Sequence, residues 1–123
     1  MQYMLLIYAE EGGFENLSQE ARDASMQEWF TYTQQMTEAG VKVAGDALLA
    51  TSAATSVRVR DGKDLVTDGP FAETKEALGG YYLMEVPSVD EAIAWAKRCP
   101  GAAYGTIELR PVMVFDYPSG GAS

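Results

Sequence analysis

Charged side chains that could hold a small molecule or move a proton occur in two separate stretches of the sequence. The first stretch contains four of them: Asp68, Glu73, Lys75 and Glu76. The second contains Glu108 and Arg110, which share one face if this part of the chain is a strand. A carboxylate can act as a general base and an arginine can hold an anion, so the two stretches together predict a small polar site.

The first stretch is expected to be a stiff turn. Pro70 fixes its own φ angle, and Gly69 can take φ values that other residues avoid. The side chain of Asp68 can accept hydrogen bonds from backbone amides that follow it. Gly79 and Gly80 end the segment, which is either an exposed acidic loop that only solvates the chain or a loop that carries function.

A series of motifs covers most of the chain from about residue 40 onward: Asp68-Gly69-Pro70-Phe71, Glu73, Lys75-Glu76, Gly79-Gly80-Tyr81, Glu91-Ala92, Cys99-Pro100-Gly101 and residues 107–112. Together they resemble the signature of the DGPF branch of the YCII-related family of small bacterial proteins. The resemblance implies a ferredoxin-like α+β domain that dimerises through its sheet, and most such proteins have no established activity. Some relatives are enzymes that act on small ring compounds with a His and an Asp. This chain contains no histidine, so that pair cannot be transferred to it.

Composition excludes several classes of partner. The formal net charge of −9 opposes binding to nucleic acid or to an anionic membrane surface. The single cysteine, Cys99, cannot form an internal disulfide and is expected to be a small packing residue. The apolar run Met4–Tyr8 is too short for a membrane span and lacks the preceding basic residues of a signal peptide, which predicts a cytoplasmic protein.

Hydrophobic periodicity predicts two helices among several strands. The expected strands are residues 2–9, 41–44, 55–60, 63–66, 81–86 and 106–115. One helix begins after the N-cap Ser18 and ends at Gly40, and the other begins after Ser88 and ends before Pro100. Asp61-Gly62 is typical of a two-residue hairpin turn. This order predicts a single domain over residues 1–118, built as a ferredoxin-like split βαβ sandwich with an extra β-hairpin, and a disordered tail over residues 119–123.

Each helix shows a stripe that is expected to pack on the sheet. The stripe of the first helix consists of Met26, Trp29, Phe30, Thr33, Met36 and Thr37. The stripe of the second consists of Val89, Ala92, Ile93 and Ala96. A stripe of methionines and aromatic residues is what a helix needs to dock on a sheet, so we interpret the first one as core and not as a cofactor site.

If both helices cover one face of the sheet, the other face needs a cover. The first strand carries large apolar residues on both of its faces, so we expect a homodimer with face-to-face sheets, a dimeric α/β barrel. In the last strand, Ile107 and Leu109 would face the helices, and Glu108 and Arg110 would face the dimer side. There the pair would meet the charges of the stretch that begins at Asp68.

The predicted site has a catalytic part and a binding part. Asp68 or Glu73 would act as the base, and Arg110 would hold an anionic substrate. The remaining ligand-binding candidates are Lys75, Glu76, Glu108, Asp46 and Tyr81, with Tyr3 as a further neighbour. An alternative is that these charges form an ion-pair network that fixes the loop and the dimer register. No metal or cofactor motif is recognised.

Two functions follow from these observations. The first is an enzyme that acts on a small acidic or aromatic molecule. The second is a non-catalytic ligand-binding or partner module, for which the family resemblance implies association with an alternative sigma factor, because genes of this type often lie beside sigma-factor genes.

Overall fold

The computed structural model describes residues 1–116, so the tail expected at residues 119–123 lies outside the described residues. The elements in chain order are β1 (Gln2–Ala9), α1 (Gln19–Glu38), β2 (Lys42–Ala47), β3 (Thr55–Arg60), β4 (Lys63–Asp68), β5 (Ala77–Glu85), α2 (Val89–Arg98) and β6 (Thr106–Pro111), with short 3₁₀ turns at Thr51–Ala53 and Pro100–Ala103.

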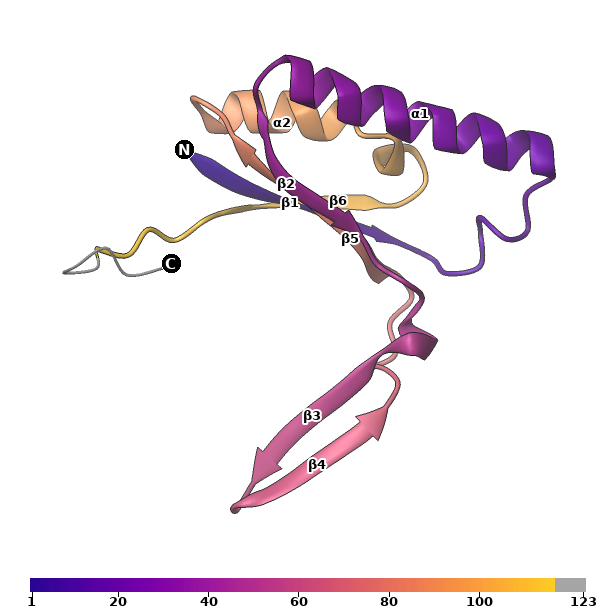
Figure 1. Ribbon diagram of the computed structural model, residues 1–123, viewed down its shortest axis with the longest axis vertical. Coiled ribbons are helices and arrows are strands. Elements are labelled where there is room, and N and C mark those ends of the chain that lie inside the picture. Colours follow the sequence, from indigo (N-terminus) through magenta and orange to yellow (C-terminus); the bar gives the residue numbers. More distant parts are fainter. Residues whose placement is uncertain (117–123) are drawn as a thin grey trace.

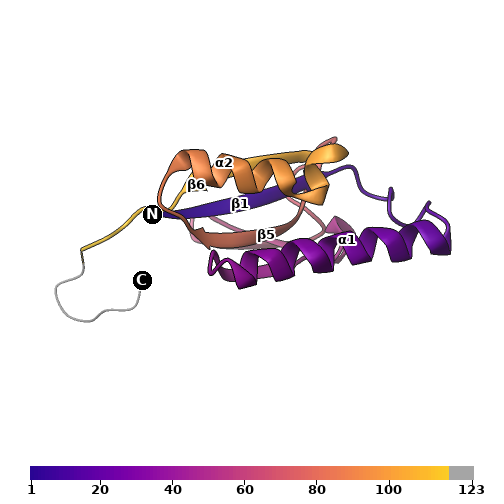
Figure 2. The same ribbon diagram turned by 90° about the horizontal axis from the view of Figure 1, so that it is seen from above.

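The fold is α+β, with one four-stranded antiparallel sheet and a separate hairpin. The sheet has the order β2-β5-β1-β6, and β3 pairs only with β4. Both helices lie on the same face of the four-stranded sheet, whereas the β3-β4 hairpin extends away from it (Figure 1, Figure 2). The order of elements agrees with the predicted split βαβ arrangement with an inserted hairpin.

The core lies between the sheet and the two helices. From the sheet, Leu5 and Met84 are fully buried, and from α1 Met36 is fully buried. The hydroxyl of Tyr32 donates a hydrogen bond of 2.8 Å to the backbone carbonyl of Trp95, which joins α1 to α2 across the core. Cys99 is buried in the same cluster, as expected of a packing residue, and burial raises the pKa of its thiol.

The helix starts are confirmed. The hydroxyl of Ser18 accepts a hydrogen bond of 3.1 Å from the amide of Ala21, and Ser88 accepts one of 3.3 Å from the amide of Glu91. Both bonds satisfy amides that the helix itself leaves without a partner.

The predicted buried stripe of α1 is partly wrong. Met26 and Phe30 are 47% and 63% exposed, whereas Tyr32, which was not assigned to the stripe, is buried. The physical reason is that the sheet opposite Met26 and Phe30 carries small residues and cannot fill the space below them, whereas Tyr32 lies between the two helices and the sheet.

The stripe of α2 is also shifted. Val89 and Ile93 are 47% and 39% exposed, and Trp95 is buried together with the correctly predicted Ala92. Trp95 is in edge-to-face contact with Tyr32, with ring centroids 6.0 Å apart. The large indole ring therefore fixes which side of α2 faces the core.

The last strand is shorter than predicted. β6 ends at Pro111 instead of residue 115, and its final pair joins Pro111 to Tyr3 of β1. One further hydrogen bond of 2.9 Å, from the amide of Val112 to the carbonyl of Gln2, follows that pair. The pairing of β6 with β1 thus ends at the residue where β1 begins, Gln2.

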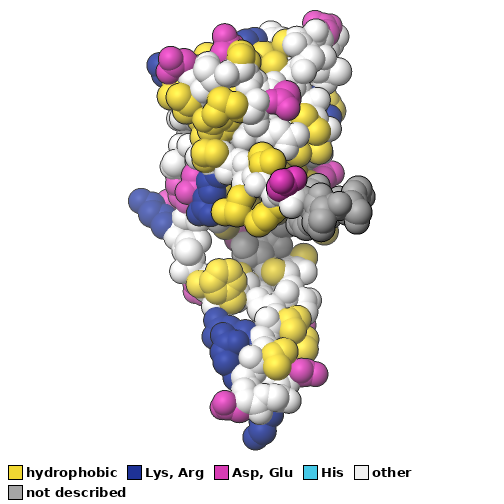
Figure 3. Space-filling view, turned by 90° about the vertical axis from the view of Figure 1, so that its left-hand side faces the viewer, with side chains coloured by type: hydrophobic (Ala, Val, Ile, Leu, Met, Phe, Trp, Pro, Cys, Tyr) yellow, Lys and Arg dark blue, Asp and Glu magenta, His cyan; other side chains and the backbone are white. Residues whose placement is uncertain are grey.

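The hairpin projects from the body of the molecule (Figure 3). At its tip Asp61 and Gly62 have φ angles of 52° and 75°, as expected of a tight turn with two left-handed residues. Val57 and Val59 are both more than half exposed, so no part of the described chain covers this apolar surface. At its base, the amide of Gly69 bonds to the carbonyl of Ala54 and its carbonyl accepts from the Ser56 hydroxyl, which holds the turn in place.

Candidate functional site

The face of the sheet that is turned away from the helices carries the charged pair of β6. The strand register sets Glu108 beside Leu6 and Arg110 beside Met4, while Ile107 and Leu109 pack against the core on the other face. The predicted division of β6 into an apolar face and a charged face is therefore confirmed.

A hollow of about 520 Å³ lies on this face, near the end of β1. We call it the polar hollow, and its lining consists of Tyr8, Glu76, Thr106, Ile107, Glu108 and Arg110. Three of the predicted site residues, Glu76, Glu108 and Arg110, thus lie around one space. Tyr8 and Thr106 were not among the predicted residues.

Glu108 is the centre of the contacts in the polar hollow. The hydroxyl of Tyr8 donates to Oε1 of Glu108 over 3.3 Å, and Nε of Arg110 lies 3.5 Å from Oε2 of the same carboxylate. At the edge of the hollow, the Thr106 hydroxyl donates a hydrogen bond of 2.8 Å to Glu76. The ion pair of Arg110 with Glu108 is made through Nε, and the guanidinium has four further N–H donors that an anion could engage.

The polar hollow is open in the single chain. The side chains of Arg110 and Glu108 are 68% and 40% exposed, and exposed ion pairs contribute only about 0 to 1 kcal/mol to stability. Desolvation, with the charge of Glu108 as a second cause, raises the pKa of Tyr8 above its usual value of 10.0. Tyr8 is therefore a protonated phenol at neutral pH, able to donate a hydrogen bond.

Asp68 and Glu73 lie apart from these residues. Asp68 is the last residue of β4, where it pairs with Thr55, and both it and Glu73 are exposed. Neither belongs to the lining of the polar hollow. Lys75 is also exposed, and its ammonium group lies 3.8 Å from the carboxylate of Glu10.

Asp46 and Tyr81 form a pair on β2 and β5. The hydroxyl of Tyr81 donates to Oδ2 of Asp46 over 2.7 Å, and this hydrogen bond to a carboxylate raises the pKa of Tyr81. Both residues also lie at the margin of a second space, between α1 and the sheet, which is described below. Tyr3 is 4% exposed and faces the helices, so the expectation that it lies beside the site is wrong.

Tyr8 could have been found from the alternation along β1. It follows Met4 and Leu6 at a spacing of two, so it belongs to the same face as they do. Its proximity to Glu108, one hundred positions away, depends on the pairing of β1 with β6, which the local pattern does not encode.

Two classes of feature are not found in the part of the chain that the structure describes. Within residues 1–116 no group of three or more Cys, Asp or Glu side chains is arranged to hold a metal ion. No helix in the same range is long and apolar enough to cross a membrane.

Comparison with known proteins shows the family of this chain and proteins that share its fold. The family model described as YCII-related domain matches residues 1–116. The uncharacterized protein R00369 of Rhizobium meliloti (strain 1021) is 35% identical over 117 residues, which cover 94% of each chain. The structure resembles that of 5-chloro-2-hydroxyhydroquinone dehydrochlorinase (TftG) from Burkholderia phenoliruptrix AC1100, solved in complex with 2,5-dihydroxybenzoquinone. The TM-score is 0.56 at 14% identity, with 92% of this chain and 94% of that chain covered. At this identity the likeness shows a shared fold only.

Proposed function

Because this chain belongs to the YCII-related domain family, we propose that it binds a small anionic ring compound in the polar hollow and transfers a proton on it. The observation that carries the proposal is the position of the Glu108 carboxylate, which lies between the Tyr8 hydroxyl and the Arg110 guanidinium. A base, a neutral acid and a cation around one space are groups that acid–base catalysis on an anion can use.

Each of the three side chains has a separate role in this proposal. The Glu108 carboxylate accepts a proton from a hydroxyl or carbon of the ring. The Arg110 guanidinium pairs with the negative charge that remains on the substrate. The Tyr8 phenol donates its one hydrogen bond to Glu108 in the free protein, and it turns this bond to the substrate oxygen once Glu108 is protonated. We assign the base to Glu108 instead of Asp68 or Glu73, because those two carboxylates lie outside the hollow.

The class of ligand is inferred by analogy. The fold relative dehydrochlorinates a hydroxylated, chlorinated ring and was solved with a dihydroxybenzoquinone. A hydroxyquinone is acidic, because its carbonyl groups delocalise the negative charge left after a proton is lost, and an anion of this kind suits Arg110 as the binding group. The motif Asp68-Gly69-Pro70-Phe71 favours the DGPF branch of the family for this chain.

We further propose that the protein works as a homodimer, in which the uncovered sheet faces pack together as a dimeric α/β barrel. Met4, Leu6 and Leu83 are half-buried apolar side chains on that face. A second copy would cover them and would also close the open side of the polar hollow. Exclusion of water there strengthens the attraction between Arg110 and an anion.

The ligand proposal is tested by a thermal-shift titration with 2,5-dihydroxybenzoquinone. A ligand at about a hundred times its dissociation constant adds about 2.7 kcal/mol of stability, which raises the melting temperature by several degrees. We expect that shift in the native protein and in the control variant Lys75→Met. The control also removes an exposed cation, but one that lies outside the hollow. We expect no shift in Arg110→Met. An equal shift in Arg110→Met and Lys75→Met would contradict the role of Arg110.

Catalysis is tested separately from binding. Tyr8→Phe and Glu108→Gln keep the shape of the hollow, so they should retain ligand binding to within about tenfold and lose turnover of a chlorinated hydroxyhydroquinone by at least a hundredfold. Turnover by Glu108→Gln at the native rate would remove Glu108 from the chemistry.

A second candidate function is a non-catalytic module that binds a protein partner such as an alternative sigma factor. The β3-β4 hairpin favours it, because Val57, Val59 and Val66 are 64%, 58% and 66% exposed on an arm that projects from the body (Figure 3). Affinity capture of a sigma factor from native lysate by the native protein, lost in Val57→Asp, is the expected result. Equal capture by both proteins would contradict a role for the hairpin.

A further inference from the structure

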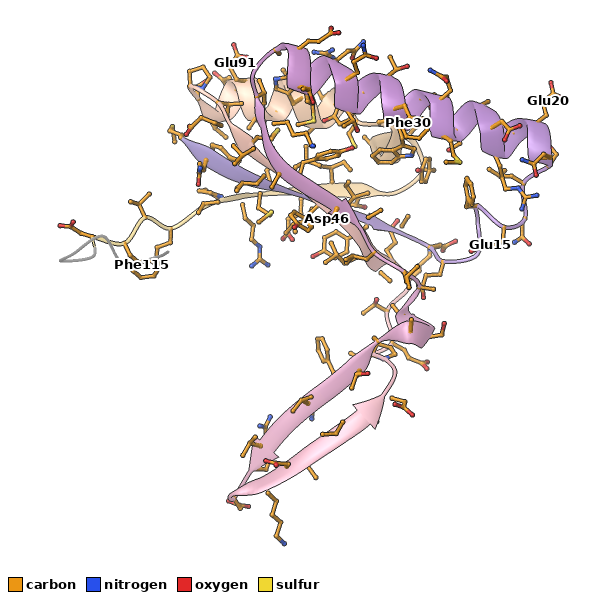
Figure 4. The ribbon with its side chains drawn as sticks, viewed as in Figure 1. Glu15, Glu20, Phe30, Asp46, Glu91 and Phe115 are labelled. Atoms are coloured by element: carbon orange, nitrogen blue, oxygen red, sulfur yellow. The ribbon has the colours of Figure 1, made fainter. Side chains whose placement is uncertain are left out.

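A second space in the molecule lies on the opposite face of the sheet from the polar hollow, between α1 and the strands. We call it the apolar cavity, and its volume is about 480 Å³. Met26, Trp29, Phe30 and Thr33 of α1 line one side of it. Figure 4 marks Phe30 on α1 and Asp46 on β2, the two elements that border the space. Cavities of about 300 to 1,000 Å³ with mainly apolar walls are typical of sites for small organic ligands.

The cavity exists because the strands below α1 carry very small residues. The strand side of the lining includes Ala9, Gly45, Ala47 and Gly80, and the register sets Ala47 beside Gly80. These residues are too short to reach the helix, so Phe30 remains 63% exposed although it belongs to an apolar stripe. A large apolar side chain left exposed above a hollow is a feature that a bound apolar molecule would explain.

Two aromatic side chains that line the apolar cavity, Tyr82 and Trp29, are held in place by hydrogen bonds. The hydroxyls of Tyr82 and Thr33 are 2.5 Å apart in a hydrogen bond, and the Tyr82 ring is in edge-to-face contact with Tyr32. The indole nitrogen of Trp29 donates to the hydroxyl of Tyr104 over 3.3 Å. Aromatic walls that are fixed before binding lose little entropy when a flat ligand enters between them.

Lys42 supplies the one positive charge among the lining residues, and the one carboxylate among them, Asp46, accepts a hydrogen bond of 2.7 Å from the hydroxyl of Tyr81. Within residues 1–116 no carboxylate lies within ion-pair distance of the Lys42 ammonium group. In a chain with a net charge of −9, a lysine with no such partner at the edge of an aromatic cavity favours a ligand that carries a negative charge.

We propose that the apolar cavity binds a planar aromatic acid, with its ring system against Trp29, Phe30 and Tyr82 and its anionic group toward Lys42. The stretch of α1 from Met26 to Thr33 is about 10 Å long at 1.5 Å per residue, which matches one or two fused rings. This site is separate from the polar hollow and does not depend on the function proposed for it.

The proposal is tested by isothermal titration of the full-length protein with 2-naphthoate. We expect binding to the native protein, about tenfold weaker binding to Phe30→Ala, and native binding to Phe71→Ala. Phe71 is a matched control because it is 79% exposed and outside the cavity. A cavity-filling change, Ala47→Phe, should abolish binding while circular dichroism shows a native fold.

The charge of the ligand is tested with a second pair of variants. Lys42→Met should weaken 2-naphthoate binding about threefold and leave binding of the neutral 2-naphthalenemethanol unchanged, whereas Lys97→Met at the end of α2 should change neither. Equal weakening of both ligands by Lys42→Met would contradict the recognition of an anion.

Three results would overturn the site. The first is that 2-naphthoate does not bind to the native protein at millimolar concentration. The second is native affinity in both Phe30→Ala and Ala47→Phe. The third is loss of binding in Arg110→Met. The last result would place the aromatic acid in the polar hollow instead, so it separates the two sites. Failure of 2,5-dihydroxybenzoquinone to bind the polar hollow would leave this proposal unaffected.

Discussion

Replacing Gly45 with alanine is expected to lower the melting temperature by about 3 to 10 °C. A Cβ atom at this position would lie 2.6 Å from Cδ1 of Tyr82 and 3.0 Å from the backbone oxygen of Tyr81. Real Cβ atoms do not approach other atoms so closely, so the Tyr82 ring would have to move. It is held by Thr33 and by the ring of Tyr32, and movement would break or strain both contacts.

The magnitude follows from two opposing effects. Overpacking of a fixed ring costs about 1 to 3 kcal/mol. Loss of backbone freedom in the unfolded chain offsets about 0.4 to 1 kcal/mol of that cost when glycine becomes alanine. The middle of each range gives a net loss of about 1 to 2 kcal/mol, and for a domain of this size each kcal/mol corresponds to roughly 3 to 5 °C.

The assay is thermal unfolding followed by circular dichroism, with Gly79→Ala as the matched control. Gly79 is also a strand glycine, but an added Cβ would have only Ile7 O as a neighbour, at 3.9 Å. We therefore expect Gly79→Ala to melt within about 2 °C of the native protein. In a Tyr82→Ala background the cost of Gly45→Ala should become smaller, because the ring that makes the closest contact is absent and only the contact with the backbone oxygen of Tyr81 remains. Equal melting of Gly45→Ala and Gly79→Ala, or a cost that is undiminished without the Tyr82 ring, would show that the ring is not the cause.

Three further predictions concern the core, the sheet face and the loop after β1. Tyr32→Phe should lower the free energy of unfolding by about 1 to 2 kcal/mol in urea, because the buried carbonyl of Trp95 loses its donor; an unchanged midpoint would contradict this. If the proposed homodimer forms, Leu6→Lys should be a monomer in light scattering, whereas Ile93→Lys on the outer side of α2 should remain a dimer. A native protein that is monomeric at micromolar concentration would contradict the proposed dimer. Hydrogen bonds from the hydroxyl and amide of Thr51 hold the pKa of Glu11 below its usual value of 4.5. The stability from Glu11 is therefore present above pH 4.5 and is lost as the pH falls through its lower, folded-state pKa. Glu11→Gln should flatten the decline in melting temperature below pH 4.5, and Glu15→Gln in the same loop should not; identical acid profiles would contradict the contact.

The local features of the fold could be derived from the sequence because neighbouring residues determine them. Ser18 and Ser88 cap their helices with their own hydroxyls, which reach amides three residues away. Asp61 and Gly62 form the hairpin turn because both tolerate positive φ angles. The alternation of Ile107 and Leu109 with the charges of β6 likewise gave the correct division of that strand.

Which apolar residues of the helices are buried could be determined only from the tertiary structure. The sequence shows that Met26 and Phe30 share an apolar stripe of α1, but not that glycines and alanines of three distant strands lie opposite them. The same stripe therefore continues as core at Met36 and becomes the edge of a cavity at Phe30. Side-chain volume across the interface, and not periodicity alone, decides which apolar residues are covered.

In the polar hollow, too, some features follow from local sequence and others only from the tertiary structure. The spacing of Glu108 and Arg110 was enough to predict that they share a face, because two positions along a strand return the side chain to the same side. Only the pairing of β1 with β6 placed Tyr8 beside Glu108, and only the path of the hairpin carried Asp68 away from both. Local backbone geometry is encoded by neighbouring residues, whereas a site assembled from distant strands depends on a register that the whole sheet and its core select together.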